Sequence, residues 1–183
     1  MLGLLGELPL NDVQVNHPVV PKALTQLDTA NATVQGDQWW FNTEYPTIAP
    51  QVGTKYILLP SDCLSVDALV AVPSVAQRGN KLYNLDDSTY EFDLPVQVKM
   101  HRLIPFEDLP HNARVYVAAQ AMLTFQNTID GDSVKTQLLK ARLDAAKAQL
   151  SAEHTRKKQV NMFNRPGIRW RLANIVGAAR LFR

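Results

Sequence analysis

The amino-acid sequence predicts an α+β fold, in which an antiparallel helical bundle carries a small β-rich insertion and ends in an extended C-terminal arm. Ten of the eleven prolines lie in residues 1–110, whereas residues 111–165 contain no proline and one glycine. Because proline interrupts helices, the first stretch favours short segments and the second favours long helices. The length of 183 residues suits one body, residues 1–163, followed by an arm, residues 164–183.

The first helix is expected at residues 17–35. Apolar residues recur there at helical spacing, for example Ala23, Leu27, Ala30 and Val34. Pro18 and Pro21 fall in the first turn of this segment, where proline is tolerated.

Residues 39–106 are expected to form the β-rich part of the chain. Glycine and proline divide this stretch into short segments. In residues 96–101 apolar and polar side chains alternate, which is typical of a half-buried strand. Residues 81–85 and 90–94 flank a polar turn at residues 86–88, which predicts a hairpin or a pair of strands.

The proline-free stretch predicts two further helices, at residues 108–130 and 132–162. Gly131 lies between them, and Asp132 or Ser133 is a suitable N-cap for the second helix. For the first, a single apolar stripe is expected at Val115, Ala118, Ala119, Met122, Phe125 and Ile129.

The helix at residues 132–162 carries two apolar stripes, which lie roughly 140° apart around it. One consists of Val134, Leu138, Ala141, Ala145 and Ala148, and the other of Leu139, Leu143, Ala146 and Leu150. Packing on one core needs one stripe, so we expect the first to contact the body and the second to contact a neighbouring subunit. The alternative is that alanine is present only as a helix former and that the second stripe is partly exposed.

Charge is distributed unevenly along the chain. The net charge of +2 hides a net charge of −5 in residues 1–150 and of +7 in residues 151–183. This asymmetry predicts a mildly acidic body with a basic arm.

The arm is a short cationic amphipathic segment. Its candidate docking residues are Arg165, Arg169, Trp170, Arg171, Leu172, Ile175, Val176, Arg180 and Phe182. Such a segment can dock on a protein partner, lie on a membrane surface, bind nucleic acid or remain a disordered tail. The size of its apolar face favours a protein partner.

No pattern in the sequence predicts a catalytic, cofactor-binding or metal-binding residue. The glycines form no phosphate-binding loop, the four histidines lack metal-ligand spacing, and the single cysteine, Cys63, excludes an intrachain disulfide. No apolar run reaches the roughly 18 residues of a membrane span. The remaining enzymatic alternative is a polysaccharide hydrolase that uses two carboxylates. Its candidates are Glu44, Asp62, Asp86, Asp87, Glu91, Asp93, Glu107 and Asp108.

Several short segments occur in an order that resembles one known family. They are LLGELPL at residues 4–10, GDQWWFN at 36–42, LLP and DCLS at 58–65, KLYN at 81–84, RLIPFEDLP at 102–110, and the stretch from Ala119 to Phe125. Together they resemble tail tubular protein A, the head-to-tail adaptor or gatekeeper family of short-tailed phages (podophages).

This resemblance implies a structural role in the virion and no catalysis. Family members form a ring of about twelve copies below the portal and join it to the tail nozzle, tubular protein B. Tail fibres are a further expected partner, and assembly is expected in the host cytoplasm. DNA is expected to pass through the bore during genome ejection without specific binding, which an acidic body favours because it repels phosphate. Nucleic-acid binding through the basic arm is the third alternative.

Overall fold

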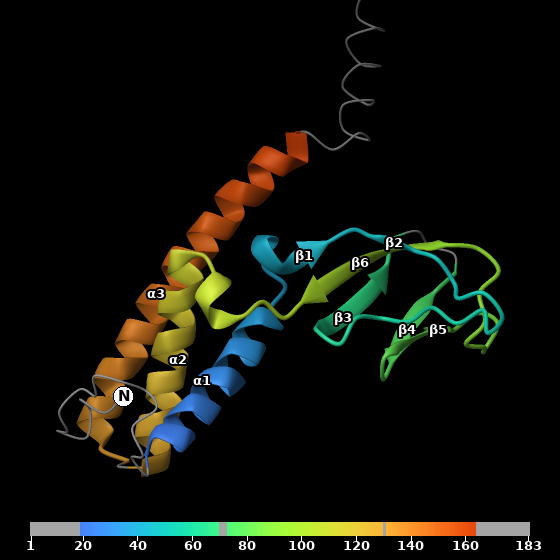
Figure 1. Cartoon of the computed structure of the whole chain (residues 1–183). Coiled ribbons are helices and arrows are strands. Elements are labelled where there is room, and N and C mark those ends of the chain that lie inside the picture. The colour runs from blue at the N-terminus through green and yellow to red at the C-terminus, as the bar shows by residue number, and fades with distance from the viewer. Residues whose placement is uncertain (1–18, 70–72, 130, 164–183) are drawn as a thin grey trace, which may run out of the picture.

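The computed structural model describes residues 19–69, 73–129 and 131–163 and shows a mixed α and β architecture (Figure 1). It contains three long helices, α1 (Val20–Gln35), α2 (His111–Ile129) and α3 (Ser133–Phe163), together with small antiparallel sheets. The β part is inserted between α1 and α2. The predicted arm, residues 164–183, lies outside the described residues.

The three helices form an open layer in which α2 lies in the middle. Helix α2 packs against both α1 and α3, whereas α1 and α3 have no comparable contact with each other. Consecutive helices run in opposite directions, so α1 and α3 point the same way (Figure 1). An open layer has two outer edges, one on α1 and one on α3.

Small residues on α2 allow it to contact two helices closely. The buried residues of this helix are Ala113, Tyr116, Val117, Ala121, Phe125 and Gln126. The single stripe predicted from the sequence is therefore wrong at its ends, since Val115 and Ile129 are exposed. A middle helix buries a broader arc, and alanine fits where two helix backbones come close.

One long strand organises the main sheet. Strand β6 (Val96–Arg102) pairs antiparallel with β1 (Thr43–Glu44), β2 (Thr47–Ile48) and β3 (Cys63–Ala68). Between β1 and β2 stands Pro46, which has no N–H group to donate. Its carbonyl still accepts a hydrogen bond from the Val98 N–H at 3.0 Å. The predicted alternation in β6 is confirmed from Val96 to Met100 but is wrong at His101, which is buried like Met100 before it.

The second sheet corrects the predicted strand pairing. Strand β5 (Lys81–Asn84) pairs with β4 (Val75–Arg78) through a two-residue turn, in which Gly79 has a φ of +62°. Residues 90–94 form no strand. The Asn84 side-chain oxygen accepts hydrogen bonds from the N–H groups of Asp86 and Asp87, and this closes a tight loop. The chain then returns beside residues 55–56, where the Phe92 N–H donates to the Lys55 carbonyl at 2.9 Å.

Two separate cores support these two parts. The helical core includes Trp39, Tyr116, Val117 and Leu150, and the sheet core includes Ile57, Leu82, Phe92 and Val98. The two 3-10 helices, η2 (Trp40–Asn42) and η3 (Phe106–Asp108), lie in the two connections between them.

Helix α3 begins at the predicted cap. The Asp132 carboxylate accepts hydrogen bonds from the N–H groups of Val134 at 2.8 Å and Lys135 at 3.3 Å.

We expect Asp132→Ala to lower the free energy of unfolding by about 1 kcal/mol, because these N–H groups lose their acceptor. Urea denaturation measures the change. The neighbouring Ser133→Ala serves as control and should stay within about 0.5 kcal/mol of wild type; equal losses for both variants contradict the assignment of Asp132 as the cap.

Candidate functional site

A buried amide joins the helical layer to the sheet. Gln35, at the end of α1, is fully buried. Its Nε2 donates to the Ile104 carbonyl at 2.8 Å, and its Oε1 accepts from the Ile104 N–H at 2.8 Å. Asn31, one turn earlier, donates to the same carbonyl at 3.1 Å and accepts a second hydrogen bond from Gln35 Nε2 at 2.8 Å. The two connections between the parts are thus bonded to each other where they cross.

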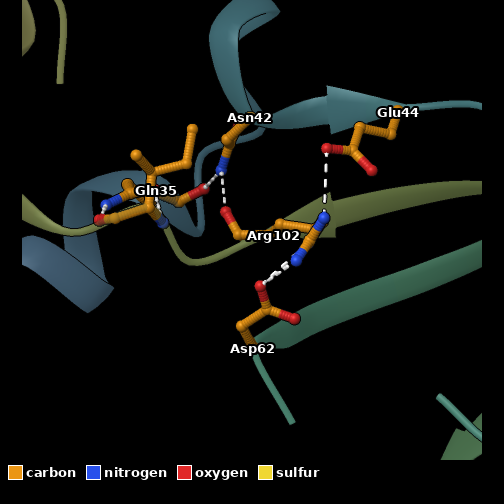
Figure 2. A network of polar contacts seen from close by, with 6 residues as sticks. Gln35, Asn42, Glu44, Asp62 and Arg102 are labelled. Atoms are coloured by element: carbon orange, nitrogen blue, oxygen red, sulfur yellow. Dashed lines mark hydrogen bonds and ion pairs between the residues drawn. The ribbon is translucent and has the colours of Figure 1, made fainter. Parts of the chain in front are cut away.

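Asn42 extends this junction to the sheet, as Figure 2 shows. Its Nδ2 donates to the Gln35 carbonyl at 2.9 Å and to the Arg102 carbonyl at 3.2 Å. The Asn42 side chain is also buried. A buried backbone carbonyl needs a hydrogen-bond donor, and here a side chain supplies it in place of a sheet or helix neighbour.

Arg102 connects three segments at the end of the sheet nearest the helices (Figure 2). Its Nε donates to Asp62 Oδ2 at 2.8 Å, its Nη2 contacts the same oxygen, and its Nη1 lies 3.5 Å from Glu44 Oε1. The hydrogen bonds that Arg102 donates to Asp62 raise the pKa of Arg102 above its usual value. All three side chains are partly exposed, so this contact orients the segments more than it stabilises them.

Trp39, Trp40 and His154 bring α3 to the same junction. The Trp39 indole donates to the Val34 carbonyl at 2.7 Å, and its ring lies edge-on to His154 with centroids 5.3 Å apart. The Trp40 N–H donates to His154 Nδ1 at 3.2 Å, which requires that nitrogen to be unprotonated. Burial, with a smaller effect from Lys158, lowers the pKa of His154.

A second histidine, His101, is fully buried on β6. Thr43 Oγ1 donates to the Trp39 carbonyl at 2.6 Å and lies 3.1 Å from His101 Nδ1, so the histidine nitrogen is the donor in this pair. His101 Nε2 has no hydrogen-bond partner among the described residues. Burial, followed by the charge of Lys99, lowers the pKa of His101.

The two stripes of α3 differ in burial from what the sequence predicts. Leu139, Ala146 and Leu150 are buried in the chain's own core, and Leu143 packs against that core. These four residues are therefore not an exposed inter-subunit face, because α2 already covers them. The stripe that begins with Val134 and Leu138 is the exposed one, with 74% and 57% of these side chains accessible.

The eight candidate carboxylates of the hydrolase alternative do not gather at one place. Glu107 and Asp108 belong to η3, and Asp86 accepts a hydrogen bond from the Ser74 N–H at 2.9 Å. Glu44 and Asp62 are bound to Arg102. Asp87, Glu91 and Asp93 line a groove of about 390 Å³ at the sheet. The hydrogen bond from Lys55, 2.7 Å away, lowers the pKa of Asp93, whereas a general acid needs a raised one.

The described residues offer little for other chemistry. Burial and then Asp62 raise the pKa of the Cys63 thiol, which opposes a nucleophilic role. In the parts of the chain that the structure describes, no group of three or more His, Cys, Asp or Glu side chains could hold a metal ion. Among the helices described, none has the length and apolar character needed to cross a membrane. The nine docking residues predicted in the arm, from Arg165 to Phe182, lie outside the described part.

Comparison with known proteins gives two findings. The family model described as "Tail tubular protein" matches residues 1–160. A protein named "Tail tubular protein A", from Klebsiella phage KP34, is 28% identical to this chain over 133 residues, which cover 72% of the chain and 71% of the relative.

The junction predicts a specific loss of stability. Gln35→Leu keeps the side-chain volume but leaves both backbone groups of Ile104 without the Gln35 amide. We expect the free energy of unfolding to fall by about 2–4 kcal/mol, because the Ile104 N–H and the Asn31 side-chain oxygen lose their hydrogen-bond partner. Urea denaturation measures this. The exposed Gln97→Leu is the matched control, with an expected change within about 0.5 kcal/mol; similar effects at both positions contradict the role given to Gln35.

His154 predicts a pH dependence of stability. Its pKa is lowered in the folded chain, so folding favours the neutral form; this stabilisation is present above the ordinary value of 6.5 and is lost as the pH falls below it. We expect wild-type stability to decline between about pH 7 and 5, and His154→Gln to decline less, because its amide oxygen accepts from Trp40 at any pH. His101 contributes the remaining decline.

Urea titrations across this pH range make the measurement. His111, which is exposed, provides the control variant His111→Gln, whose decline should match wild type. A decline in His154→Gln as steep as in the control rules out the proposed linkage.

Proposed function

Since the chain belongs to the tail tubular protein family, a family of phage tail structural proteins, we propose that it forms the ring-shaped head-to-tail adaptor. In this role, about twelve copies join the portal to the tail nozzle and surround the channel through which DNA leaves the head. The protein is a virion component, and its assembly takes place in the host cytoplasm before packing into the tail.

The observation that carries this proposal is the exposed apolar face of α3. Val134 and Leu138 are large apolar side chains that stand in solvent at the edge of the helical layer. Contiguous exposed apolar residues indicate a contact with another protein. A chain with one such edge and a different surface on the opposite side can assemble head to tail, and head-to-tail contacts close into rings.

The charge of the β part supports passage of DNA without capture. Residues 36–110 contain ten Asp and Glu against five Lys and Arg. A net negative surface repels phosphate and gives DNA no binding site. The tail nozzle, and tail fibres attached near it, complete the set of expected partners.

The basic arm, residues 164–183, is proposed to dock on the portal. It carries five arginines and no acidic residue, together with the apolar side chains Trp170, Leu172, Ile175, Val176 and Phe182. Arginine and aromatic residues are the usual anchors of protein interfaces. The arm directly follows α3, so its docking would fix the end of the longest helix.

A chain that ends at Phe163 tests this assignment. We expect the truncated chain to keep the helical circular-dichroism signal and unfolding midpoint of the full chain but to lose binding to purified portal in a pull-down. The full chain, mixed with the portal, should form a ring of about twelve copies in native mass spectrometry.

Two results contradict the proposal separately. Portal binding that survives truncation removes the docking role of the arm. A full chain that forms no ring even with the portal removes the adaptor function. If the arm instead binds DNA, its affinity for a DNA duplex will fall steeply with salt concentration.

A further inference from the structure

The exposed stripe of α3 continues further than the sequence pattern suggested. It comprises Val134, Leu138, Ala141, Ala145, Ala148 and Ala152, all exposed, and we call it the α3 outer face. Their spacing alternates between four and three residues, which is the repeat of a helix that packs along another helix. Because Leu139, Ala146 and Leu150 are buried on the opposite side of α3, the outer face points away from the rest of the layer.

A shallow apolar groove lies between α1 and α2. Its volume is about 240 Å³. Its lining consists of Pro21, Lys22, Thr25, Gln26, Phe125, Thr128 and Ile129. The Thr25 hydroxyl donates to the Pro21 carbonyl at 2.9 Å, and the Thr128 hydroxyl donates to the Thr124 carbonyl at 2.8 Å. Each hydroxyl therefore has a partner within its own helix, so apolar side chains can cover the groove without leaving these donors unpaired.

The two surfaces lie at the same end of the layer. The groove lies at the start of α1 and the end of α2, and Val134 and Leu138 lie in the first two turns of α3. These helix ends meet at one end of the molecule in Figure 1. One surface is a pair of exposed apolar side chains on α3, and the other is a groove between α1 and α2.

We propose that Val134 and Leu138 of one copy enter the α1–α2 groove of the next copy, so that the helical layers continue from subunit to subunit. The proposal rests on the ring described above. In a ring of about twelve copies, neighbours differ by a rotation of about 30°, so α3 of one copy and α1 of the next remain close to parallel. Parallel helices at one axial level bring the start of α3 beside the start of α1.

Charge complementarity supports a second copy of this chain as the occupant. When Val134 lies beside Pro21, Arg142 lies at the level of Asp28, since these residues are eight and seven positions further along their helices. Both are exposed, and neither makes an ion pair within the part of the chain that the structure describes.

Two single variants test the contact from its two sides. Leu138→Asp places a charge on the α3 outer face, and Ile129→Arg places one at the groove; both side chains are exposed, so the fold should persist, as circular dichroism will verify. Each variant alone should be monomeric by analytical ultracentrifugation under conditions in which the wild-type chain associates. Lys147→Asp, also exposed on α3 but outside this face, is the matched control and should associate like wild type.

A mixture of the two variants gives the most specific result. Leu138→Asp keeps an intact groove and Ile129→Arg keeps an intact outer face, so one contact can form between them and no further copy can add. The mixture should sediment as a heterodimer of twice the monomer mass.

Three outcomes overturn the inference. They are association of Leu138→Asp at the wild-type level, a mixture that stays monomeric, and a wild-type chain that is monomeric at every concentration. These outcomes are distinct from failure of the adaptor function. Portal binding tests that function, and a loss of portal binding by a chain that still associates contradicts the adaptor and leaves this interface intact.

A charge exchange provides an independent measurement. Asp28→Arg and Arg142→Asp should each weaken association about threefold, and the double variant should restore it, because the pair is re-formed with its signs reversed. Additive losses in the double variant speak against the alignment of α3 with α1.

Discussion

The hydrogen bonds between the Gln35 side chain and the Ile104 backbone hold the molecule together at its narrowest point. The chain leaves the helical layer after α1 and returns before α2, and the two passages meet where their backbone groups are buried. Without a sheet or helix partner at this point, those groups need side-chain amides. Gln35, Asn31 and Asn42 supply them, so the position of the sheet relative to the helices depends on three uncharged polar residues.

Local signals in the sequence predicted the helices and strands, but not which of them pair or pack with one another. The Asp132 cap and the alternation in β6 from Val96 to Met100 depend on neighbours along the chain, and both are present. The pairing of β5 with β4 depends on the loop that Asn84 closes, and the choice between the two stripes of α3 depends on where α2 lies. These are properties of the folded chain, which a helical wheel does not contain.

Some of the residues that form the junction lie in sequence segments that already stood out by their family resemblance. Two of the segments that resemble the tail tubular protein family, residues 36–42 and 102–110, contain Asn42, Arg102 and Ile104, which form the junction. Composition and periodicity treat a glutamine such as Gln35 as a surface residue, since amides are mostly exposed. Its burial follows from tertiary structure. The arm, by contrast, is assigned from its composition alone, and its docking remains a prediction.

The doubled connection at Gln35 has a mechanical consequence. A part attached through a single strand can swivel about one bond, but two crossing passages, bonded to each other and to Asn42, resist both bending and twisting. A push on the sheet is therefore transmitted into α1 and α2 together, and through Trp40 and His154 into α3. The chain then behaves as a stiff lever, so a displacement of the sheet reaches the helical layer with little lost in between.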